Sequence, residues 1–239
     1  MAENAEENLL SERVDAVRER IAQACARSGR DVDMVGLIAV SKKFPADVVH
    51  DVHRCGVNVF GESRVQEALQ KIPECPGMID WHFIGRLQSN KVRPVVSTFS
   101  MIHSVDSLAL LERVEAIAYD EGPRVDVCLQ VNVAGEGSKT GVLPDQAEAI
   151  VERAQAFNNA RLVGLMTMPP FAPDPEDVRP HFAALRALRD TVEARCGVSL
   201  PDLSMGMSHD FEVAIEEGAT WIRVGNAIFG KRVVPRHVE

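Results

Sequence analysis

Two adjacent lysines, Lys42 and Lys43, directly follow an apolar run at residues 35–40, and either could supply an amine for chemistry. A buried strand over that run would deliver one lysine to its carboxyl end. Burial lowers the pKa of a lysine toward the neutral, nucleophilic form that imine formation requires. Strand alternation sends neighbouring side chains to opposite faces, so only one of the two can point inward, and we prefer Lys42. Local composition alone favours a solvated loop lysine, so the rest of the chain must decide.

Two turns of small residues could hold an anion. Residues 204–208 read S-M-G-M-S and residues 223–226 read R-V-G-N, and a helical pattern follows each turn. Glycine lets the backbone approach a ligand closely, and free amides at a helix start favour an anion. The alternative is simple capping, with Ser208 and Asn226 as N-cap residues. The two turns together favour a phosphate site.

An amine facing a phosphate anchor suggests a phosphorylated aldehyde held as a Schiff base on Lys42. Pyridoxal 5′-phosphate (PLP) fits that description. A site for some other phosphorylated metabolite, without a Schiff base, is the simpler alternative.

The elements that must position these groups alternate between strand and helix. Short β-rich runs are predicted as strands at 35–40, 57–60, 81–84, 100–103, 125–133, 161–166, 202–205 and 220–224, and helical patterns at 46–55, 63–71, 88–97, 107–120, 144–157, 176–195, 209–217 and 226–230. Such alternation requires a parallel sheet. Eight units predict a closed (β/α)₈ barrel of the TIM type, with a doubly wound open sheet as the alternative. In a barrel, the carboxyl ends of the strands and the loops after them form one mouth, which is where ligands bind.

One further helix precedes the barrel. Leu10, Val14, Val17, Ile21 and Ala24 recur at helical spacing, and Ser28-Gly29 ends the pattern. We expect residues 1–8 to be a flexible acidic tail and residues 9–239 to form a single PLP-binding barrel domain. The proline-rich segment 169–175 is expected as a stiff loop over the strand ends.

Composition limits the classes of partner and the cell compartment. The chain has 239 residues, a formal net charge of −9 and 46% hydrophobic residues, which is typical of a folded globular protein and argues against nucleic acid binding. No apolar run approaches the length of a membrane span, and the acidic start lacks a signal peptide's apolar core. The cysteines are scattered and odd in number, so we expect reduced thiols and a cytoplasmic protein: Cys25, Cys55, Cys75, Cys128 and Cys196. His50 and His53 have helical spacing suited to a metal, yet no third ligand is apparent, so no metal site is predicted.

Several segments together resemble one family. They are A-V-S-K at 39–42, F-G-E at 60–62, W-H-F-I-G at 81–85 with L-Q-S-N-K at 87–91, G-L-M at 164–166, S-M-G-M-S at 204–208, and I-R-V-G at 222–225 with I-F-G at 228–230. This order of motifs, from about residue 10 to 232, resembles the YggS/PROSC family of pyridoxal phosphate homeostasis proteins. The resemblance implies a barrel like the amino-terminal domain of alanine racemase, with the cofactor on the lysine matching Lys42.

The resemblance also implies the other cofactor contacts. Phosphate contacts are implied at the positions matching Ser208, Gly225 and Asn226, an arginine beside the pyridine nitrogen at Arg223, and a residue near the ring at Asn58. The chain departs from the family pattern in three places. It has Asn226 in place of serine or threonine, Ser63 in place of asparagine, and Arg86 in place of a non-basic residue. Asn226 loses a hydroxyl contact to phosphate but keeps its backbone amide.

The arginine and the lack of a suitable tyrosine argue for a carrier. A fixed positive charge at Arg223 disfavours protonation of the pyridine nitrogen, and an unprotonated ring is a poorer electron sink. Racemisation needs a second acid or base, and the one tyrosine, Tyr119, is predicted far from the mouth. His82 and His103 could substitute, although a lone histidine at a strand end is more often structural. The prediction is PLP binding and intracellular PLP homeostasis with little or no turnover, and a racemase-like PLP enzyme is the alternative. By analogy we expect a monomer that lacks a racemase's second domain and serves PLP-requiring apoenzymes.

Overall fold

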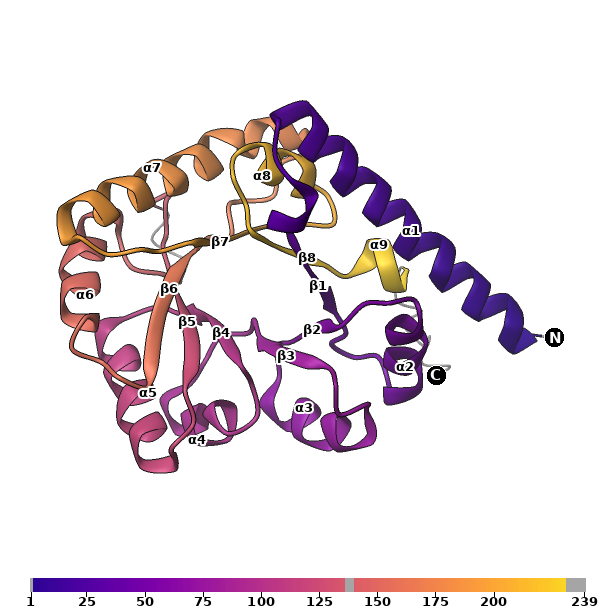
Figure 1. The fold of residues 1–239 in the computed structure, drawn as a ribbon, viewed down its shortest axis with the longest axis horizontal. Coiled ribbons are helices and arrows are strands. Elements are labelled where there is room, and N and C mark those ends of the chain that lie inside the picture. Colours follow the sequence, from indigo (N-terminus) through magenta and orange to yellow (C-terminus); the bar gives the residue numbers. More distant parts are fainter. Residues whose placement is uncertain (1, 136–139, 231–239) are drawn as a thin grey trace, which may run out of the picture.

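Eight parallel strands close into a barrel in the computed structural model, which describes residues 2–135 and 140–230 (Figure 1). The strand order follows the chain, and β1 pairs with both β2 and β8. The strands are β1 (Gly36–Val40), β2 (Val59–Glu62), β3 (Asp80–Phe83), β4 (Met101–Val105), β5 (Val125–Gln130), β6 (Ala160–Met166), β7 (Asp202–Met207) and β8 (Trp221–Val224). The predicted (β/α)₈ barrel is confirmed, and the open-sheet alternative is wrong.

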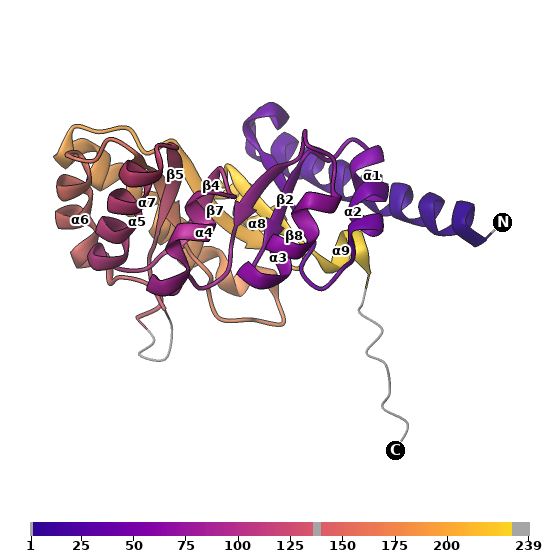
Figure 2. The ribbon, with the colours of Figure 1, turned by 90° about the horizontal axis from the view of Figure 1, so that it is seen from below.

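Helices cover the outside of the barrel, each following its strand (Figures 1 and 2). They are α2 (Ala46–Arg54), α3 (Val65–Lys71), α4 (Val92–Val96), α5 (Leu108–Glu121), α6 (Ala147–Ala154), α7 (Arg179–Cys196), α8 (Phe211–Glu216) and α9 (Asn226–Phe229). The ends of α2, α3, α5, α8 and α9 lie within about two residues of the predicted ends. In the segments that contain α4, α6 and α7, a 3-10 turn forms the first part of the predicted helix. None of these helices, nor α1, is long and apolar enough to cross a bilayer.

The amino-terminal helix α1 (Ala2–Ser28) lies against α8 and α9 on the outside of the barrel (Figure 1). Its predicted apolar stripe is buried: Leu10, Val14, Val17, Ile21 and Ala24. Arg20 and Arg27 form ion pairs of 2.6 Å with Glu212 and Glu216 of α8. The helix begins inside the segment for which the sequence suggests a tail, so residues 2–8 continue it toward the amino terminus.

Closure of the barrel depends on Gly36 at the start of β1. Gly36 pairs with Trp221 of β8, and a Cβ atom at position 36 would lie 2.2 Å from the indole ring. Only glycine lets that ring cover the first strand at the amino end of the barrel.

The second strand lies two residues later than its sequence pattern indicates. The β-rich letters cover residues 57–60, but the strand is Val59–Glu62. Gly61 and Glu62 have low strand propensity, yet their surroundings suit them: Gly61 packs closely on Ile38, and Glu62 has buried partners. The shift places Asn58 before the strand.

Candidate functional site

A cavity of about 680 Å³ opens at the carboxyl ends of β1, β7 and β8. Its lining is Val40, Lys42, Phe44, Ile84, Met168, Phe171, Met207, Ser208, His209, Arg223, Gly225 and Asn226. The volume suits a small organic ligand, and apolar walls with few polar groups are typical of a cofactor site.

The turn after β1 separates the two lysines. Lys42 is half-buried and lines the cavity, whereas Lys43 is exposed and lines a different pocket beside α3. Lys43 has φ of 69°, a left-handed conformation that non-glycine residues rarely adopt, and its backbone N–H donates to the Glu67 carboxylate. This turn accounts for the two directions, because β1 ends at Val40 and strand alternation does not extend to either lysine.

A buried ion pair fixes the residue before Lys42. The Lys71 ammonium donates to Glu62 Oε1 at 2.7 Å and to the Ser41 carbonyl at 2.9 Å, and the Ser41 hydroxyl donates to the same carboxylate oxygen at 2.7 Å. Burial raises the pKa of the Glu62 carboxyl, while the Lys71 and Ser41 contacts oppose that shift. Sequence reasoning missed this cluster, because the helical spacing of Glu67 and Lys71 indicates only their own contact, at 3.4 Å, and not the pair with Glu62.

The aromatic ring of Phe44 connects the lysine turn to the last helix. It stacks on Phe229 of α9 with ring centroids 4.7 Å apart. On the opposite rim, the predicted loop at 169–175 is irregular, as expected, and His209 contacts its Ala172 and Pro173 carbonyls at 3.2 and 3.1 Å. Phe171 of this loop packs against the His209 ring, so these two residues form one side of the cavity mouth.

Arg223 forms the floor of the cavity and is 4% exposed. Its guanidinium donates to the Ser204 hydroxyl at 2.6 Å and to the Thr167 carbonyl at 3.0 Å. Burial lowers the pKa of Arg223 to about 10, with Asp210 and Cys128 opposing, so the group is a cation at neutral pH. The sequence marked Arg223 but missed Ser204 and Thr167 as its partners, because only the strand register reveals them.

The two small-residue turns meet as expected. Ser208 Oγ accepts from the Gly225 N–H at 3.1 Å and the Ala227 N–H at 3.4 Å, so the turn after β7 contacts the start of α9. The capping alternative was wrong in its assignment, because the N-cap residues of α8 and α9 are Asp210 and Gly225. Ser208 and Asn226 both face the cavity. The Ser208 hydroxyl oxygen therefore accepts the first amides of α9, and Ser208 and Asn226 lie together at one side of the cavity.

Asn58 does not join this group. It precedes β2 and lines a separate pocket of about 360 Å³ with Arg18 and Ile21 of α1. In a parallel barrel the amino ends of the strands lie on the face opposite the mouth. The position of Asn58 at the amino end of β2 thus does not support the ring contact that the family resemblance implies.

The alternative acid–base residues lie away from the cavity wall. His82 and His103 are buried at 2% and 0% exposure and contact each other at 3.0 Å, while Tyr119 is 72% exposed on α5. His50 and His53 bond to the Glu74 and Val57 carbonyls at 2.8 and 3.0 Å.

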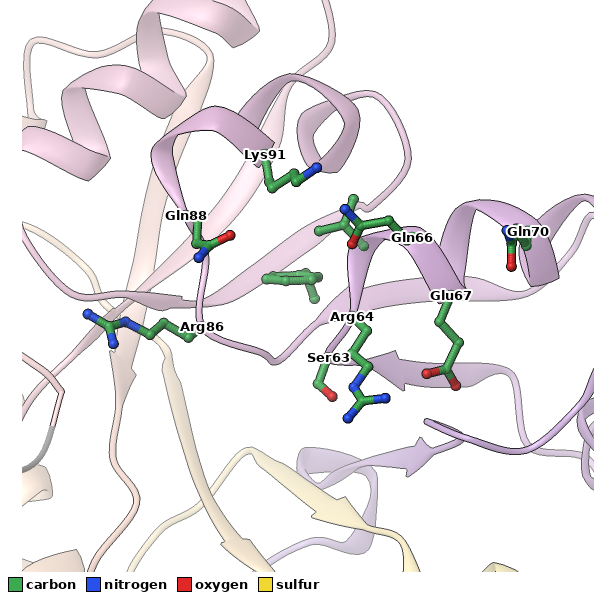
Figure 3. Close-up of a pocket in the computed structure, with 10 residues that line it drawn as sticks. Ser63, Arg64, Gln66, Glu67, Gln70, Arg86, Gln88 and Lys91 are labelled. Atoms are coloured by element: carbon green, nitrogen blue, oxygen red, sulfur yellow. The ribbon is translucent and has the colours of Figure 1, made fainter.

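A neighbouring pocket of about 420 Å³ contains two of the three departures from the family pattern, Ser63 and Arg86 (Figure 3). Arg64 and Lys91 also line it. In Figure 3 the guanidinium of Arg86 points away from both other cations, so the three positive charges do not converge on one ligand.

Comparisons with known proteins agree with this geometry. Residues 13–233 match the family model described as alanine racemase, N-terminal domain. The chain is 46% identical over 222 residues to the pyridoxal phosphate homeostasis protein of Aquifex aeolicus, covering 92% of this chain and 97% of that one. The human protein of the same name is 41% identical over 234 residues, covering 91% of this chain and 84% of that one.

Solved structures show the same fold. PipY of Synechococcus elongatus, with PLP bound, superposes with a TM-score of 0.81 at 36% identity, covering 92% of this chain and all of that one. An alanine racemase of Clostridium difficile shares the fold at 14% identity and a TM-score of 0.69, with 91% of this chain and 59% of that one covered.

Proposed function

Since the chain belongs to the family of pyridoxal phosphate homeostasis proteins, we propose that it binds PLP at the barrel mouth as a Schiff base on Lys42 and takes part in intracellular PLP homeostasis. The observation that carries this proposal is the meeting of Lys42, Arg223 and the two turns in one cavity. The PLP-bound PipY structure supports the choice of cofactor.

The residues of the cavity fit PLP. Bound PLP supplies an aldehyde that an amine can attack and an electron sink when its ring nitrogen is protonated. Lys42 provides the amine, and Val40, Phe44 and Ile84 provide apolar walls beside it. Ser208 and Asn226 would hold the phosphate through a hydroxyl and a backbone amide, and Gly225, whose N–H donates to Ser208 Oγ, positions that hydroxyl. Asn226 contributes its amide in place of the family's hydroxyl.

Arg223 supports a role with little or no turnover. As a buried cation on the cavity floor, Arg223 would disfavour a proton on the pyridine nitrogen of PLP held in this cavity. Among the described residues the tyrosine side chain lies on the outer face of α5, so it cannot act as a second base at Lys42. A racemase-like activity would have to use another group. We also propose a cytoplasmic monomer that delivers PLP to apoenzymes.

Spectral titration tests the assignment. PLP added to the purified protein should produce the yellow absorbance of a protonated Schiff base in the wild type and in Lys43→Ala, and should leave Lys42→Ala without it. Equal absorbance in the Lys42→Ala protein would exclude Lys42 as the residue that forms the Schiff base. A second measurement addresses turnover: the loaded protein is incubated with L-alanine and L-serine, and the products are separated by chiral chromatography. We expect no D-enantiomer above the level of free PLP, and catalytic racemisation would contradict the carrier role.

A further inference from the structure

A row of polar side chains crosses the barrel interior beneath the cavity. Arg223 Nη1 donates to Ser204 Oγ at 2.6 Å, and Ser204 Oγ lies 2.7 Å from His103 Nδ1. His103 Nε2 lies 3.0 Å from His82 Nδ1, and His82 Nε2 lies 3.3 Å from Asp80 Oδ2. The row therefore runs from the mouth, at the carboxyl end of β8, to the opposite face, at the start of β3.

The interior members of this row are shielded from water. His82, His103, Ser204 and Arg223 are between 0% and 4% exposed, whereas the Asp80 side chain is 47% exposed. The Trp221 ring packs edge-on against His82, with ring centroids 4.9 Å apart. Because buried polar groups must find partners in the protein, the hydrogen positions within the row are strongly constrained.

The hydrogens available in the row can satisfy its four contacts when all of them are donated in the same direction. The row has four contacts, and with both histidines neutral it has four hydrogens: one from Arg223, one from Ser204, one from His103 and one from His82. Arginine can only donate, and a carboxylate can only accept. Ser204 thus accepts from Arg223 and donates to His103 Nδ1, His103 Nε2–H donates to His82 Nδ1, and His82 Nε2–H donates to Asp80.

The charges at the two ends favour the same direction. Burial, together with the buried Arg223 cation, holds the pKa of His103 well below its ordinary value, so this ring is neutral. The hydrogen bond from His82 lowers the pKa of the Asp80 carboxyl, which keeps it an anion. The reversed arrangement with neutral rings would place the His82 Nε2 lone pair against the carboxylate, and a protonated His82 would put a second cation in the same buried row as Arg223.

We propose that Ser204, His103, His82 and Asp80 are positioning residues that orient Arg223 toward the cofactor through a one-way hydrogen-bond relay across the barrel. The relay holds one N–H of the guanidinium and the Thr167 carbonyl holds another, so the Arg223 side chain that lines the cavity is fixed from two sides. The part concerning the cofactor rests on the proposed function; the direction of the relay does not.

Nitrogen-15 NMR of the two histidines tests the relay in protein without PLP. Ring shifts and couplings should show His82 and His103 both neutral, each with its hydrogen on Nε2 and with a bare Nδ1. A hydrogen on Nδ1 of His103, or a doubly protonated His82 at neutral pH, would overturn the proposal. Because no PLP is present, this result stands whether or not Lys42 carries the cofactor.

Substitutions then test the effect on the cofactor site. In Ser204→Ala the guanidinium and His103 each lose a partner, and an unpaired buried donor should weaken PLP binding about tenfold. Ser104→Ala is the matched control, because Ser104 is an equally buried hydroxyl that donates to the Gly85 carbonyl, outside the relay, and its PLP affinity should stay within about twofold of the wild type.

Replacement of His103 separates positioning from packing. His103→Gln can accept from Ser204 and donate to His82 through one amide, so it should retain PLP affinity within about threefold, whereas His103→Leu should lose about tenfold. Equal affinity of Ser204→Ala and Ser104→Ala, or of the glutamine and leucine proteins, would contradict the positioning role. If a variant fails to fold, the NMR assignment of the wild type still decides the direction. A wild type without Schiff-base absorbance would refute the proposed function and leave the relay to the NMR result.

Discussion

Replacing Lys71 by methionine should destabilise the protein by about 3 kcal/mol, because it removes one partner of a buried ion pair. The Glu62 side chain is 0% exposed and that of Lys71 is 6% exposed, with 2.7 Å between Nζ and Oε1. Loss of one partner of such a pair typically costs about 3–5 kcal/mol, since an uncompensated charge remains in the interior. Glu62 Oε2 already has no hydrogen-bond partner among the described residues, so the carboxylate would depend on the Ser41 hydroxyl alone. That remaining bond places the expected loss at the lower end of the range.

Urea denaturation at pH 7 measures this loss. The double variant Lys71→Met with Glu62→Gln should recover about 2 kcal/mol of it, because the neutral amide still bonds to Ser41 and no buried charge is left. Arg153→Met is the control, since its ion pair with Glu112 is exposed and should contribute less than about 1 kcal/mol. A loss below 1 kcal/mol for Lys71→Met, or a double variant no more stable than the single one, would refute the reasoning.

The pH dependence has a definite sign. Burial raises the folded-state pKa of Glu62 above its unfolded value, so stability is greatest with the carboxyl protonated and is lost as pH rises through the folded pKa. In Lys71→Met the raising effect is no longer opposed by the ammonium. The stability difference between the wild type and this variant should therefore shrink as the solution is acidified.

Substitutions at Gly206, with Gly122 as its control, and at Glu115 test two local features of the fold. Gly206→Ala should reduce the free energy of unfolding by about 2–4 kcal/mol, because φ is +91° and the new Cβ atom would lie 2.6 Å from Ala214 Cβ. Gly122→Ala is the control: its φ is +88° but the space around it is open, so it should cost about 1 kcal/mol in the same thermal or urea assay. Equal losses would contradict the steric argument. Glu115 accepts backbone N–H bonds from residues 158, 159 and 160; burial raises its pKa, but these bonds outweigh burial and lower it. The stability that the Glu115 carboxylate contributes is present above its unfolded pKa and is lost as pH falls through its folded pKa. Glu115→Gln should therefore be about 1–2 kcal/mol less stable than the wild type at pH 7, and the two proteins should become equally stable in acid. A stability difference that does not change with pH would show that the charge is irrelevant.

The barrel and its mouth could be predicted from sequence because they depend on local patterns. Strand and helix periods set the eight units, and the position of Lys42 after the first apolar run places it at the mouth of any such barrel. Asn58 could not be placed, because the limits of β2 depend on Gly61 packing on Ile38 and on the partners of Glu62. Neither contact can be predicted from local strand propensity.

The relay beneath Arg223 was equally beyond sequence reasoning. Ser204 and His103 are 101 residues apart in the chain, and their contact depends on which side chains point into the barrel at a given level. The sequence marks His82 and His103 as histidines near strand ends and suggests that they are structural. Only the assembled sheet shows that they connect the cofactor cavity to Asp80.

Borohydride reduction followed by peptide mass mapping is the most direct test of the central claim, because it identifies cofactor and residue together. Reduction of the PLP-loaded protein should fix a phosphopyridoxyl group on the peptide that contains Lys42, and sequencing of that peptide should place it on Lys42 and leave Lys43 unmodified. A label on Lys43, on Lys71 or on Lys91, or no stable label after reduction, would contradict the proposal that Lys42 holds PLP.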